Sequence, residues 1–388
     1  MRDLRELRDE IDRIDRQLLP LFIERMELCG AVADYKMENG LPVLDAAREK
    51  QVLKEKQSLL TKPGYDEAVY EFFSSVMAIS RGLQAKKIKD VKKEEEFHAY
   101  FTRLRDRVAH PAICYFGAKG SYSEAAAIKY FGEGETRFCA DSFEGAFAAL
   151  AEQRADYAVV PIENSSTGAI AEVMDLLERC GCYMVGEVHL PICHCLLAKA
   201  GTAVGDIKTV YSHEQGLLQS KDYLKSLGDV RQEVCCSTAM SARMVAESDD
   251  PTVAAIAGRQ NAALYGLTVL KENVNTSAQN TTRFAVVAKR PENSAACNKI
   301  SIAFTLAHEC GELYRVLSCF VRGGLNLLKL ESRPIPNQPF SYMFFVDYSG
   351  NLSDPHVRAV TEAVIAETQR FKLLGNYPAG SVKEPEQS

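Results

Sequence analysis

Residues 4–39 read LRELRDEIDRIDRQLLPLFIERMELCGAVADYKMEN, and apolar residues recur along them with the 3.6-residue period of an amphipathic helix. The apolar stripe consists of Leu4, Leu7, Ile11, Ile14, Leu18, Leu21, Phe22, Cys29 and Val32. At about 1.5 Å per residue this helix would be roughly 50 Å long, more than the neighbouring N-terminal residues can cover. We therefore expect an intertwined dimer that shares one helical core, with a kink at Pro20, where a backbone hydrogen bond is lost.

Two more helices are expected before the composition changes near residue 86. Asp45 is a favourable N-cap for a second helix that ends near Leu60, and Lys62-Pro63-Gly64 separates it from a third helix over 65–86. Residues 87–110 are rich in charge and are interpreted as a helical, solvated linker. The sequence thus predicts an all-α N-terminal domain over residues 1–86.

Residues 111–290 alternate between strand and helix patterns, which is typical of an α/β domain. Apolar strand-like runs recur at 113–116, 156–162, 210–212, 252–256 and 284–288, with helical patterns between them. We expect two lobes with mainly parallel sheets. Residues 298–378 follow the order strand, helix, strand, strand, helix, strand, which predicts a small α+β sandwich of the ferredoxin-like kind. Residues 379–388 are expected to be a disordered tail.

The bulk composition excludes several classes of protein. A length of 388 residues indicates two or three domains, and the net charge of −6 argues against nucleic acid as a partner. No apolar run reaches the ~18 residues of a membrane helix, and the charged N-terminus lacks the apolar segment of a secretory signal. We expect a cytoplasmic protein without membrane contact.

The 12 cysteines raise the question of a metal site. The nearest approach to a ligand set is Cys180, Cys182, Cys193, His194 and Cys195. None of these spacings is CxxC, and most of these residues lie in apolar runs, so reduced, buried cysteines are favoured. We expect neither a metal nor a cofactor.

Polar residues interrupt the apolar faces of the predicted N-terminal helices. Arg25 and Lys36 fall near the centre of the first stripe and Arg8 falls at its edge. Cations on a core face are costly unless they are paired. Further polar positions on the next two helices are Asp45, Arg48, Glu49, Ser80 and Gln84. Periodicity leaves two interpretations open: a buried site for an anionic ligand, or ion pairs within the helices.

These same positions carry a resemblance. The run from Leu4 to Leu53, with ISRGLQ at 79–84, resembles the all-helical chorismate mutase domain over about residues 1–86. The resemblance implies that Arg25, and Arg8 from a partner subunit, bind the carboxylates of chorismate. It implies that Lys36 and Gln84 contact the ether oxygen and that Ser80 supports a carboxylate. Glu49, Asp45 and Arg48 would hold the ring hydroxyl.

The middle region has polar loops where predicted strands end. These loops are residues 120–123, 161–166, 212–215, 237–239 and 281–284. Hydroxyls and amides at strand-to-helix junctions suit carboxylate binding, but a single Ser or Thr there is more often a helix cap. Five such loops together indicate a polar site without identifying its reaction.

The runs that contain these loops resemble prephenate dehydratase over about residues 111–290. They include YFGAKGSYSEAAAIKYFG (115–132), ADYAVVPIENSSTGAI (155–170), YSHEQGL (211–217), STAMSARMVAE (237–247) and NTTRFAVVAK (280–289). The resemblance implies two lobes like those of periplasmic binding proteins, with the site in the cleft. Thr282 is our candidate for the proton donor or its positioner, and His213 is the alternative acid. The implied substrate contacts are Asn164, Ser212, His213, Gln215, Thr238, Thr281, Arg283 and Phe284.

Residues 299–378 resemble an ACT regulatory domain. Glu331-Ser332-Arg333-Pro334 matches the ESRP motif of phenylalanine-binding members, whereas Gly311-Glu312-Leu313-Tyr314 matches a second motif less closely. The implied phenylalanine contacts are Gly311, Leu313, Asn326, Leu327, Glu331, Ser332 and Arg333. Without the resemblance, the ESRP run is interpreted as a strand end with a surface ion pair.

Together these resemblances imply a bifunctional enzyme of phenylalanine biosynthesis. It would convert chorismate to prephenate and prephenate to phenylpyruvate, would be inhibited by L-phenylalanine, and would form a homodimer or a larger homo-oligomer. The alternative is an amino-acid sensor that retains only the chorismate mutase step.

Overall fold

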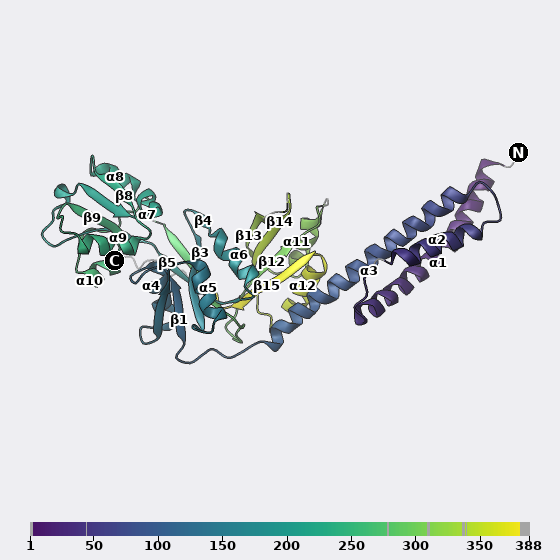
Figure 1. Cartoon of the computed structure of the whole chain (residues 1–388), viewed down its shortest axis with the longest axis horizontal. Helices are drawn as coiled ribbons and strands as arrows, with labels where there is room; N and C mark the ends of the chain where they lie inside the picture. Colours follow the sequence, from purple (N-terminus) through teal and green to yellow (C-terminus); the bar gives the residue numbers. More distant parts are fainter. Residues whose placement is uncertain are drawn as a thin grey trace. The chain divides into compact units, whose positions relative to one another are not determined.

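The computed structural model describes residues 3–43, 45–277, 279–308, 311–335, 338 and 340–380. The chain divides into two compact units, Met1–His98 and Ala99–Ser388. Three helices account for most of the first unit: α1 (Leu4–Glu38), α2 (Ala46–Ser58) and α3 (Asp66–Thr102) (Figure 1). The predicted all-α character of this region is therefore confirmed.

Three details of these helices bear on the sequence predictions. Helix α1 is continuous through Pro20, so the proline does not end it. Asp45 caps α2 as expected, because its Oδ1 accepts a hydrogen bond from the backbone N–H of Arg48 at 2.9 Å. The predicted end of the third helix at 86 is wrong, since α3 continues to Thr102. Lys and Glu, which dominate that stretch, are good helix formers.

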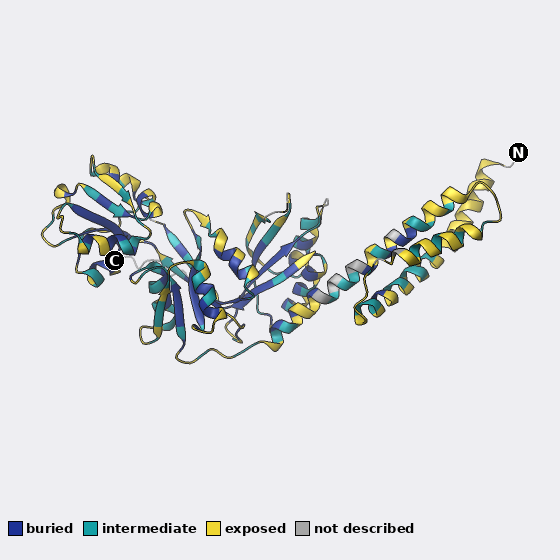
Figure 2. Cartoon of the chain, viewed as in Figure 1, coloured by how far each residue is buried: buried dark blue, intermediate teal, exposed yellow. Residues whose placement is uncertain are grey.

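The apolar stripe of α1 is largely uncovered within one chain. Ala33 is the one residue of α1 that is buried among those described. Ile11 is 56% exposed, Leu18 45% and Leu28 63%, and most of α1 is coloured as exposed in Figure 2. A stripe of this length normally faces a core.

The described residues of the second unit form three sheets, and the first two are built from residues 112–288 with helices packed on them. The first sheet has the order β2-β1-β3-β11-β5, and β4 pairs with β3. Its strands are β1 (Ala112–Phe116), β2 (Thr136–Ala140), β3 (Tyr157–Asn164), β4 (Gly168–Ala169), β5 (Tyr183–Pro191) and β11 (Thr281–Ala288). Its helices are α4 (Tyr122–Phe131), α5 (Phe143–Ala151) and α6 (Ala171–Arg179). Apolar clusters cover both faces of this sheet.

The second sheet has the order β10-β6-β9-β7-β8. Its strands are β6 (His194–Ala198), β7 (Thr209–Ser212), β8 (Arg231–Val234), β9 (Val253–Gly258) and β10 (Thr268–Lys271). The 3-10 helix η1 (Val204–Asp206) and helices α7 (Glu214–Gln219), α8 (Lys221–Ser226), α9 (Thr238–Glu247) and α10 (Gln260–Tyr265) complete this lobe. The two sheets confirm the expected α/β pattern with two lobes.

The expectation of mainly parallel sheets is wrong. Strand β1 is parallel to β2 and β3, but β11 is antiparallel to both β3 and β5. Strand β6 is likewise antiparallel to β9 and β10. The chain leaves the first lobe after β5, builds the second lobe, and returns as β11 between β3 and β5. The returning strand β11 runs against both of its neighbours, and the strand pattern in the sequence does not reveal this direction.

The C-terminal part forms the predicted α+β sandwich. Its elements are β12 (Lys299–Thr305), α11 (Glu312–Arg322), β13 (Leu327–Pro334), β14 (Tyr342–Ser349), α12 (Pro355–Ala366) and β15 (Arg370–Tyr377). The sheet order is β13-β14-β12-β15, and each pair is antiparallel. Ala303, Phe345 and Leu374 share one apolar cluster with residues of the first sheet, β2-β1-β3-β11-β5. Strand β15 approaches β5 so closely that a Cβ on Gly375 would lie 2.2 Å from the carbonyl oxygen of Met184.

Three remaining expectations can be compared with the described residues. Within them, no helix is long and apolar enough to cross a bilayer, and no group of His, Cys, Asp and Glu could hold a metal ion. The cysteines in these ranges are free thiols. Of the expected tail over 379–388, residues 381–388 lie outside the described part, while the backbone N–H of Gly380 donates to Glu187 Oε1 at 2.9 Å.

Candidate active sites

Helices α1 and α3 bring Arg25 and Ser80 together in the first unit. Arg25 donates from a terminal guanidinium nitrogen to Ser80 Oγ at 2.9 Å, and Cys29 Sγ lies 3.1 Å from the same hydroxyl. Ser80 is 5% exposed. A cation on the apolar face of α1 is therefore oriented by a buried hydroxyl, as the buried-site interpretation requires.

Gln84 lies one helical turn after Ser80 on α3. It is 6% exposed, and its side-chain oxygen has no hydrogen-bond partner in the part of the chain that the structure describes. A buried polar atom without a partner costs about 1–3 kcal/mol. A polar ligand in this interior would remove that cost.

The other expected polar residues of this unit lie around the N-terminus of α2. Glu49 forms an ion pair with Arg81, a residue that our sequence reasoning did not single out although it belongs to the ISRGLQ run. Lys36 Nζ donates to the carbonyl oxygen of Val43 at 2.6 Å, and Arg48 is exposed. Among the described residues, the hydrogen bonds and ion pairs of Lys36 and Glu49 do not include Gln84.

Arg8 is exposed and distant from Arg25 within one chain. Arg25 lies 17 positions after Arg8, which corresponds to about 25 Å along a continuous helix. A single copy therefore cannot present both guanidinium groups to one small ligand.

A buried polar cluster lies where β3 and β11 pair in the second unit. Thr282 is opposite Asn164 in the ladder, and Asn164 Nδ2 donates to Thr282 Oγ1 and to Asn280 Oδ1, both at 2.8 Å. The backbone N–H of Ser166 donates to Asn164 Oδ1 at 2.9 Å, which fixes the orientation of the amide. Because Thr282 Oγ1 accepts from Asn164, its own hydroxyl proton remains available to donate to a ligand.

The cluster continues through residues that our sequence reasoning missed as site residues. Gln219 Oε1 accepts from Asn280 Nδ2 at 2.9 Å and lies 3.0 Å from His194 Nε2. Tyr122 OH lies 3.3 Å from His194 Nδ1. Burial lowers the pKa of His194 and outweighs the hydrogen bond to Gln219, so the imidazole is held neutral. Asn280 precedes the TTRF run, whereas nothing local in the sequence marks Gln219.

A pocket of about 200 Å³ opens beside this cluster. Its lining comprises Ser166, Thr167, Leu218, Gln219, Lys221, Asn275, Thr276, Ser277 and Asn280. Hydroxyls, amides and one ammonium group are suitable donors for a small carboxylate. Both lobes contribute, because Ser166 follows β3 and Gln219 ends α7.

The remaining expected residues of the second lobe surround α7. Ser212 Oγ donates to the carbonyl oxygen of Ile256 at 2.7 Å, and His213 Nδ1 accepts from the backbone N–H of Gln215 at 3.2 Å. A Cβ on Gly216 would lie 2.4 Å from Ser212 Oγ and 3.2 Å from Thr238 Cγ2. Ser212 and Thr238 are therefore neighbours, whereas His213 acts as a helix cap and Gln215 is exposed.

Within the described part of the chain, the other three residues of the TTRF run do not join the hydrogen bonds of the Asn164–Thr282 cluster. Thr281 exchanges hydrogen bonds with Ser165. Arg283 pairs with Glu187 and Asp347, and Phe284 is 2% exposed within an apolar core cluster. Arg283 thus faces the C-terminal sheet and Phe284 lies in the core, and their expected contact with substrate stays a prediction.

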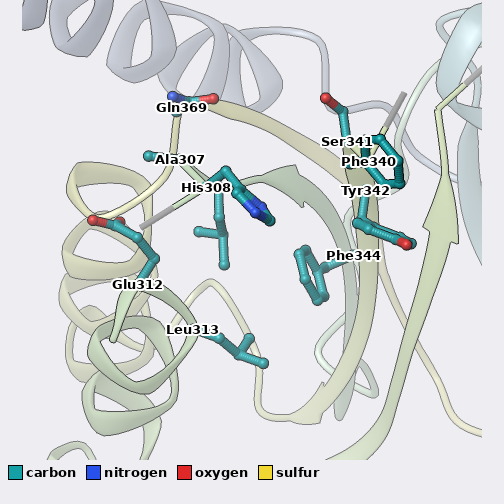
Figure 3. Close-up of a pocket in the computed structure, with 10 residues that line it drawn as sticks. Ala307, His308, Glu312, Leu313, Phe340, Ser341, Tyr342, Phe344 and Gln369 are labelled. Carbon is teal, nitrogen blue, oxygen red and sulfur yellow. The ribbon is translucent and has the colours of Figure 1, made fainter. Parts of the chain in front are cut away.

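A second pocket, of about 420 Å³, lies in the C-terminal part. It is lined by Leu306, Ala307, His308, Glu312, Leu313, Phe340, Ser341, Tyr342, Phe344 and Gln369. Phe340, Tyr342 and Phe344 gather on one side of it and Glu312 lies on the other (Figure 3). Glu312 pairs with Arg315. An aromatic wall opposite a carboxylate suits a small aromatic amine.

Of the residues expected to bind phenylalanine, Leu313 lines this pocket and Gly311 precedes it as the N-cap of α11. Residues Asn326, Leu327, Glu331, Ser332 and Arg333 are not part of its lining. Arg333 instead pairs with Asp175 of α6 at 2.9 Å, which is the ion pair that the sequence left open as an alternative.

Comparison with known proteins relates both units to named families. The model of the family "Chorismate mutase type II" matches residues 7–85, and that of "Prephenate dehydratase" matches residues 113–292. The chain is 32% identical over 390 residues to the bifunctional chorismate mutase/prephenate dehydratase of Aquifex aeolicus, covering 99% of this chain and 100% of that one.

Two solved structures share the fold of the second unit. The prephenate dehydratase of Arthrobacter aurescens in complex with L-Phe has a TM-score of 0.63 and 28% identity, with 69% of this chain and 89% of that one covered. GqqA, described as a novel type of quorum quenching acylase, has a TM-score of 0.62 and 29% identity, with 69% and 98% covered.

Proposed function

The chain belongs to the family of bifunctional chorismate mutase/prephenate dehydratases, and we propose which of its residues carry the two reactions and how they are controlled. The enzyme rearranges chorismate to prephenate. It then removes water and carbon dioxide from prephenate to give phenylpyruvate. We propose that the mutase domain spans residues 1–86, the charged linker 87–110, the dehydratase domain 111–290 and the ACT regulatory domain 298–378.

The mutase site is proposed to form between two copies of the chain. The exposed apolar stripe of α1 supports this, because a second copy would bury it. The separation of Arg8 from Arg25 supports it as well, since Arg8 of a second copy can reach a site that Arg8 of the same copy cannot. We propose that these two arginines bind the carboxylates of chorismate and that Ser80 orients Arg25.

The rearrangement is pericyclic and needs no nucleophile. The site must hold the substrate in a compact conformation and stabilise negative charge on the ether oxygen as the C–O bond breaks. We assign that charge stabilisation to Lys36 and Gln84, and the unpartnered buried amide of Gln84 supports it. Glu49, with Asp45 and Arg48, is assigned to the ring hydroxyl.

The dehydratase centre is proposed to be the Asn164–Thr282 pair and the adjoining pocket. As the ring carboxylate leaves as carbon dioxide, its electron pair enters the ring and expels the hydroxyl, which departs as water after receiving a proton. Thr282 is the hydrogen-bond donor to that oxygen, and Asn164 polarises its hydroxyl. The observation that carries this assignment is the free hydroxyl proton of Thr282 in a buried cluster beside a carboxylate-sized pocket.

Prephenate carries two carboxylates, and the lining of the pocket can bind the one that is retained. Gln219, Lys221 and Asn280 are the donors we propose there. Ser212 and Thr238 are proposed to contact substrate from the second lobe, with His213 and Gln215 on the adjoining turn. Polar groups from two lobes also exclude bulk water when the cleft closes.

Control by L-phenylalanine is proposed to act through the C-terminal domain. The support is the aromatic pocket with Glu312 opposite its wall, and the relative from Arthrobacter aurescens that was solved with L-Phe. Glu312, which lies in the run that matches the second motif less closely, would pair with the ammonium group of the effector.

One experiment tests the three assignments together. Purified protein is given chorismate, and prephenate and phenylpyruvate are followed over time with and without L-phenylalanine. Phenylpyruvate that appears and is suppressed by L-phenylalanine supports the proposals. Prephenate that accumulates alone would favour the sensor with only a mutase step. Unsuppressed phenylpyruvate would refute control by L-phenylalanine.

A further inference from the structure

The β3–β11 ladder carries different chemistry on its two faces. Asn164 is opposite Thr282, and the neighbouring Glu163 is opposite Arg283. Successive side chains along a strand point to opposite faces of a sheet. The hydrogen-bonded Asn164–Thr282 pair therefore lies on one face of the ladder. Glu163 and Arg283, 3.4 Å apart, lie on the opposite face, which we call the back face.

Arg283 is the centre of a buried charge cluster on that back face. Its Nε lies 2.7 Å from Glu187 Oε2, and a terminal nitrogen lies 2.7 Å from Asp347 Oδ2. Tyr377 OH accepts from the other terminal nitrogen at 3.0 Å, and Lys299 Nζ lies 3.0 Å from Glu187. The side chain of Glu187 is 1% exposed and that of Arg283 12%. Three of the partners come from the C-terminal strands β12, β14 and β15.

Lys329 gives the back face a second connection to the C-terminal sheet. Its Nζ lies 3.0 Å from Glu163 Oε2 and 3.0 Å from Glu331 Oε2. Lys329, Glu331 and Arg333 alternate with exposed residues along β13, so they share the less exposed face of this edge strand. Arg333 extends the contact to Asp175 of α6.

The ion pairs around Arg283 are buried, so a movement of the C-terminal strands would be transmitted to the β3–β11 ladder. Moving a C-terminal strand would leave a charge in the cluster without its partner, and an uncompensated buried charge is strongly unfavourable. The ladder must therefore follow those strands. By contrast, the pair Arg370–Glu178 joins the same two domains at side-chain exposures of 61% and 26%, where ion pairs contribute little.

We propose that Glu163 and Arg283 are positioning residues for the Asn164–Thr282 pair, and that Lys329 couples them to the C-terminal domain. An effector that shifts β13 or β14 then changes the orientation of the Thr282 hydroxyl through the ladder. Coupling of this kind requires two arrangements of the ladder with different affinity for the effector. The proposal rests on the dehydratase centre and the L-phenylalanine control proposed above.

The test uses the full chain with three substitutions. Lys329→Met removes the charge at nearly constant length, Lys329→Arg retains it, and Arg370→Met removes the exposed interdomain pair as a matched control. Binding of L-phenylalanine is measured by equilibrium dialysis, and inhibition by following prephenate consumption. We expect Lys329→Met to bind L-phenylalanine within about twofold of the unmodified chain while the concentration for half-inhibition rises about tenfold or more. Lys329→Arg and Arg370→Met should be inhibited normally.

Several outcomes would overturn the proposal. Normal inhibition of Lys329→Met would show that the back face does not carry the signal, while leaving the dehydratase centre and its control intact. Loss of L-phenylalanine binding in Lys329→Met would make Lys329 part of the effector site instead. Lack of inhibition in the unmodified chain would refute the control itself, before any variant is compared. Lys329→Gln, which retains a hydrogen-bond donor, replaces Lys329→Met if the latter loses mutase activity through misfolding.

Discussion

At the scale of single residues, the dehydratase centre depends on which donor and acceptor atoms already form hydrogen bonds within the protein. Asn164 donates to Thr282, and the backbone N–H of Ser166 prevents the amide from turning over. A threonine hydroxyl is a weak acid, so it contributes as an oriented donor to the leaving oxygen. If this assignment is right, the dehydratase reaction needs the hydroxyl group of Thr282 and does not need its methyl group.

Replacing Thr282 by valine should lower the dehydratase kcat by about 10²–10⁴-fold, because the donor to the leaving hydroxyl is lost at nearly constant volume. Thr282→Ser, which keeps the hydroxyl, should retain most of the activity. The measurement is prephenate consumption, with chorismate consumption by the same protein as the internal control. Equal activity in the valine and serine variants would remove Thr282 from the mechanism.

Replacing Arg283 by lysine distinguishes positioning from direct substrate binding. Lysine cannot bridge Glu187 and Asp347 as the guanidinium does. We expect the dehydratase kcat to fall about tenfold while KM changes by less than about threefold. A large rise in KM at nearly constant kcat would instead restore the sequence-based expectation that Arg283 binds prephenate.

At the scale of elements, the contact between β5, β11 and the C-terminal strands is held by charges. Burial opposes ionisation of Glu187, but the nearby His189 and the charges of Arg283 and Lys299 outweigh it and lower the pKa to about 2. Burial by itself lowers the pKa of Arg283, but Tyr377, Asp347 and Glu187 raise it by more, so the guanidinium stays charged. The cluster therefore couples the folding of these strands to pH.

Stability from Glu187 should be lost in acid. Its folded pKa lies below the ordinary value of 4.5, so the contribution is complete above that pH and disappears as the pH falls toward about 2. The contribution is on the order of 3 kcal/mol. Thermal unfolding of the unmodified chain and Glu187→Gln should differ most above pH 5 and converge at lower pH. A difference that did not depend on pH would contradict this linkage.

At the scale of the whole molecule, the two units differ in how far one chain completes them. In the second unit, apolar clusters cover both faces of the first sheet, and one of them also includes residues of the C-terminal sandwich. The first unit leaves Ile11, Leu18 and Leu28 about half exposed or more. We propose that a second copy of the chain covers these exposed apolar residues of the first unit.

Mixing two inactive variants tests the shared mutase site. Arg8→Ala and Arg25→Ala should each lose most mutase activity. Subunits mixed after dissociation should recover about a quarter of the original activity, because random pairing restores one of two sites in half of the dimers. Dehydratase activity serves as the control and should be unaffected throughout. No recovery, with dimers shown by sedimentation, would contradict a mutase site that combines Arg25 of one copy with Arg8 of the other.

Much of this protein follows from the sequence alone. The 3.6-residue stripe of α1, the Asp45 cap, the alternation of strands and helices, and the βαββαβ order all depend on local periodicity and capping, which neighbours in the chain specify. The short runs around Ser80, Asn164 and Thr282 likewise marked residues that the fold brings into polar clusters.

Tertiary structure decided what depends on the meeting of distant segments. The antiparallel insertion of β11 pairs residues more than a hundred positions apart, and it places Thr282 toward the pocket and Arg283 toward the C-terminal sheet. Gln219 and His194 join the site because Asn280, directly before β11, donates to Gln219 Oε1, and His194 lies 3.0 Å from the same oxygen. No local pattern contains the direction of a returning strand, so the division of the TTRF run between two faces could be read only from the folded chain.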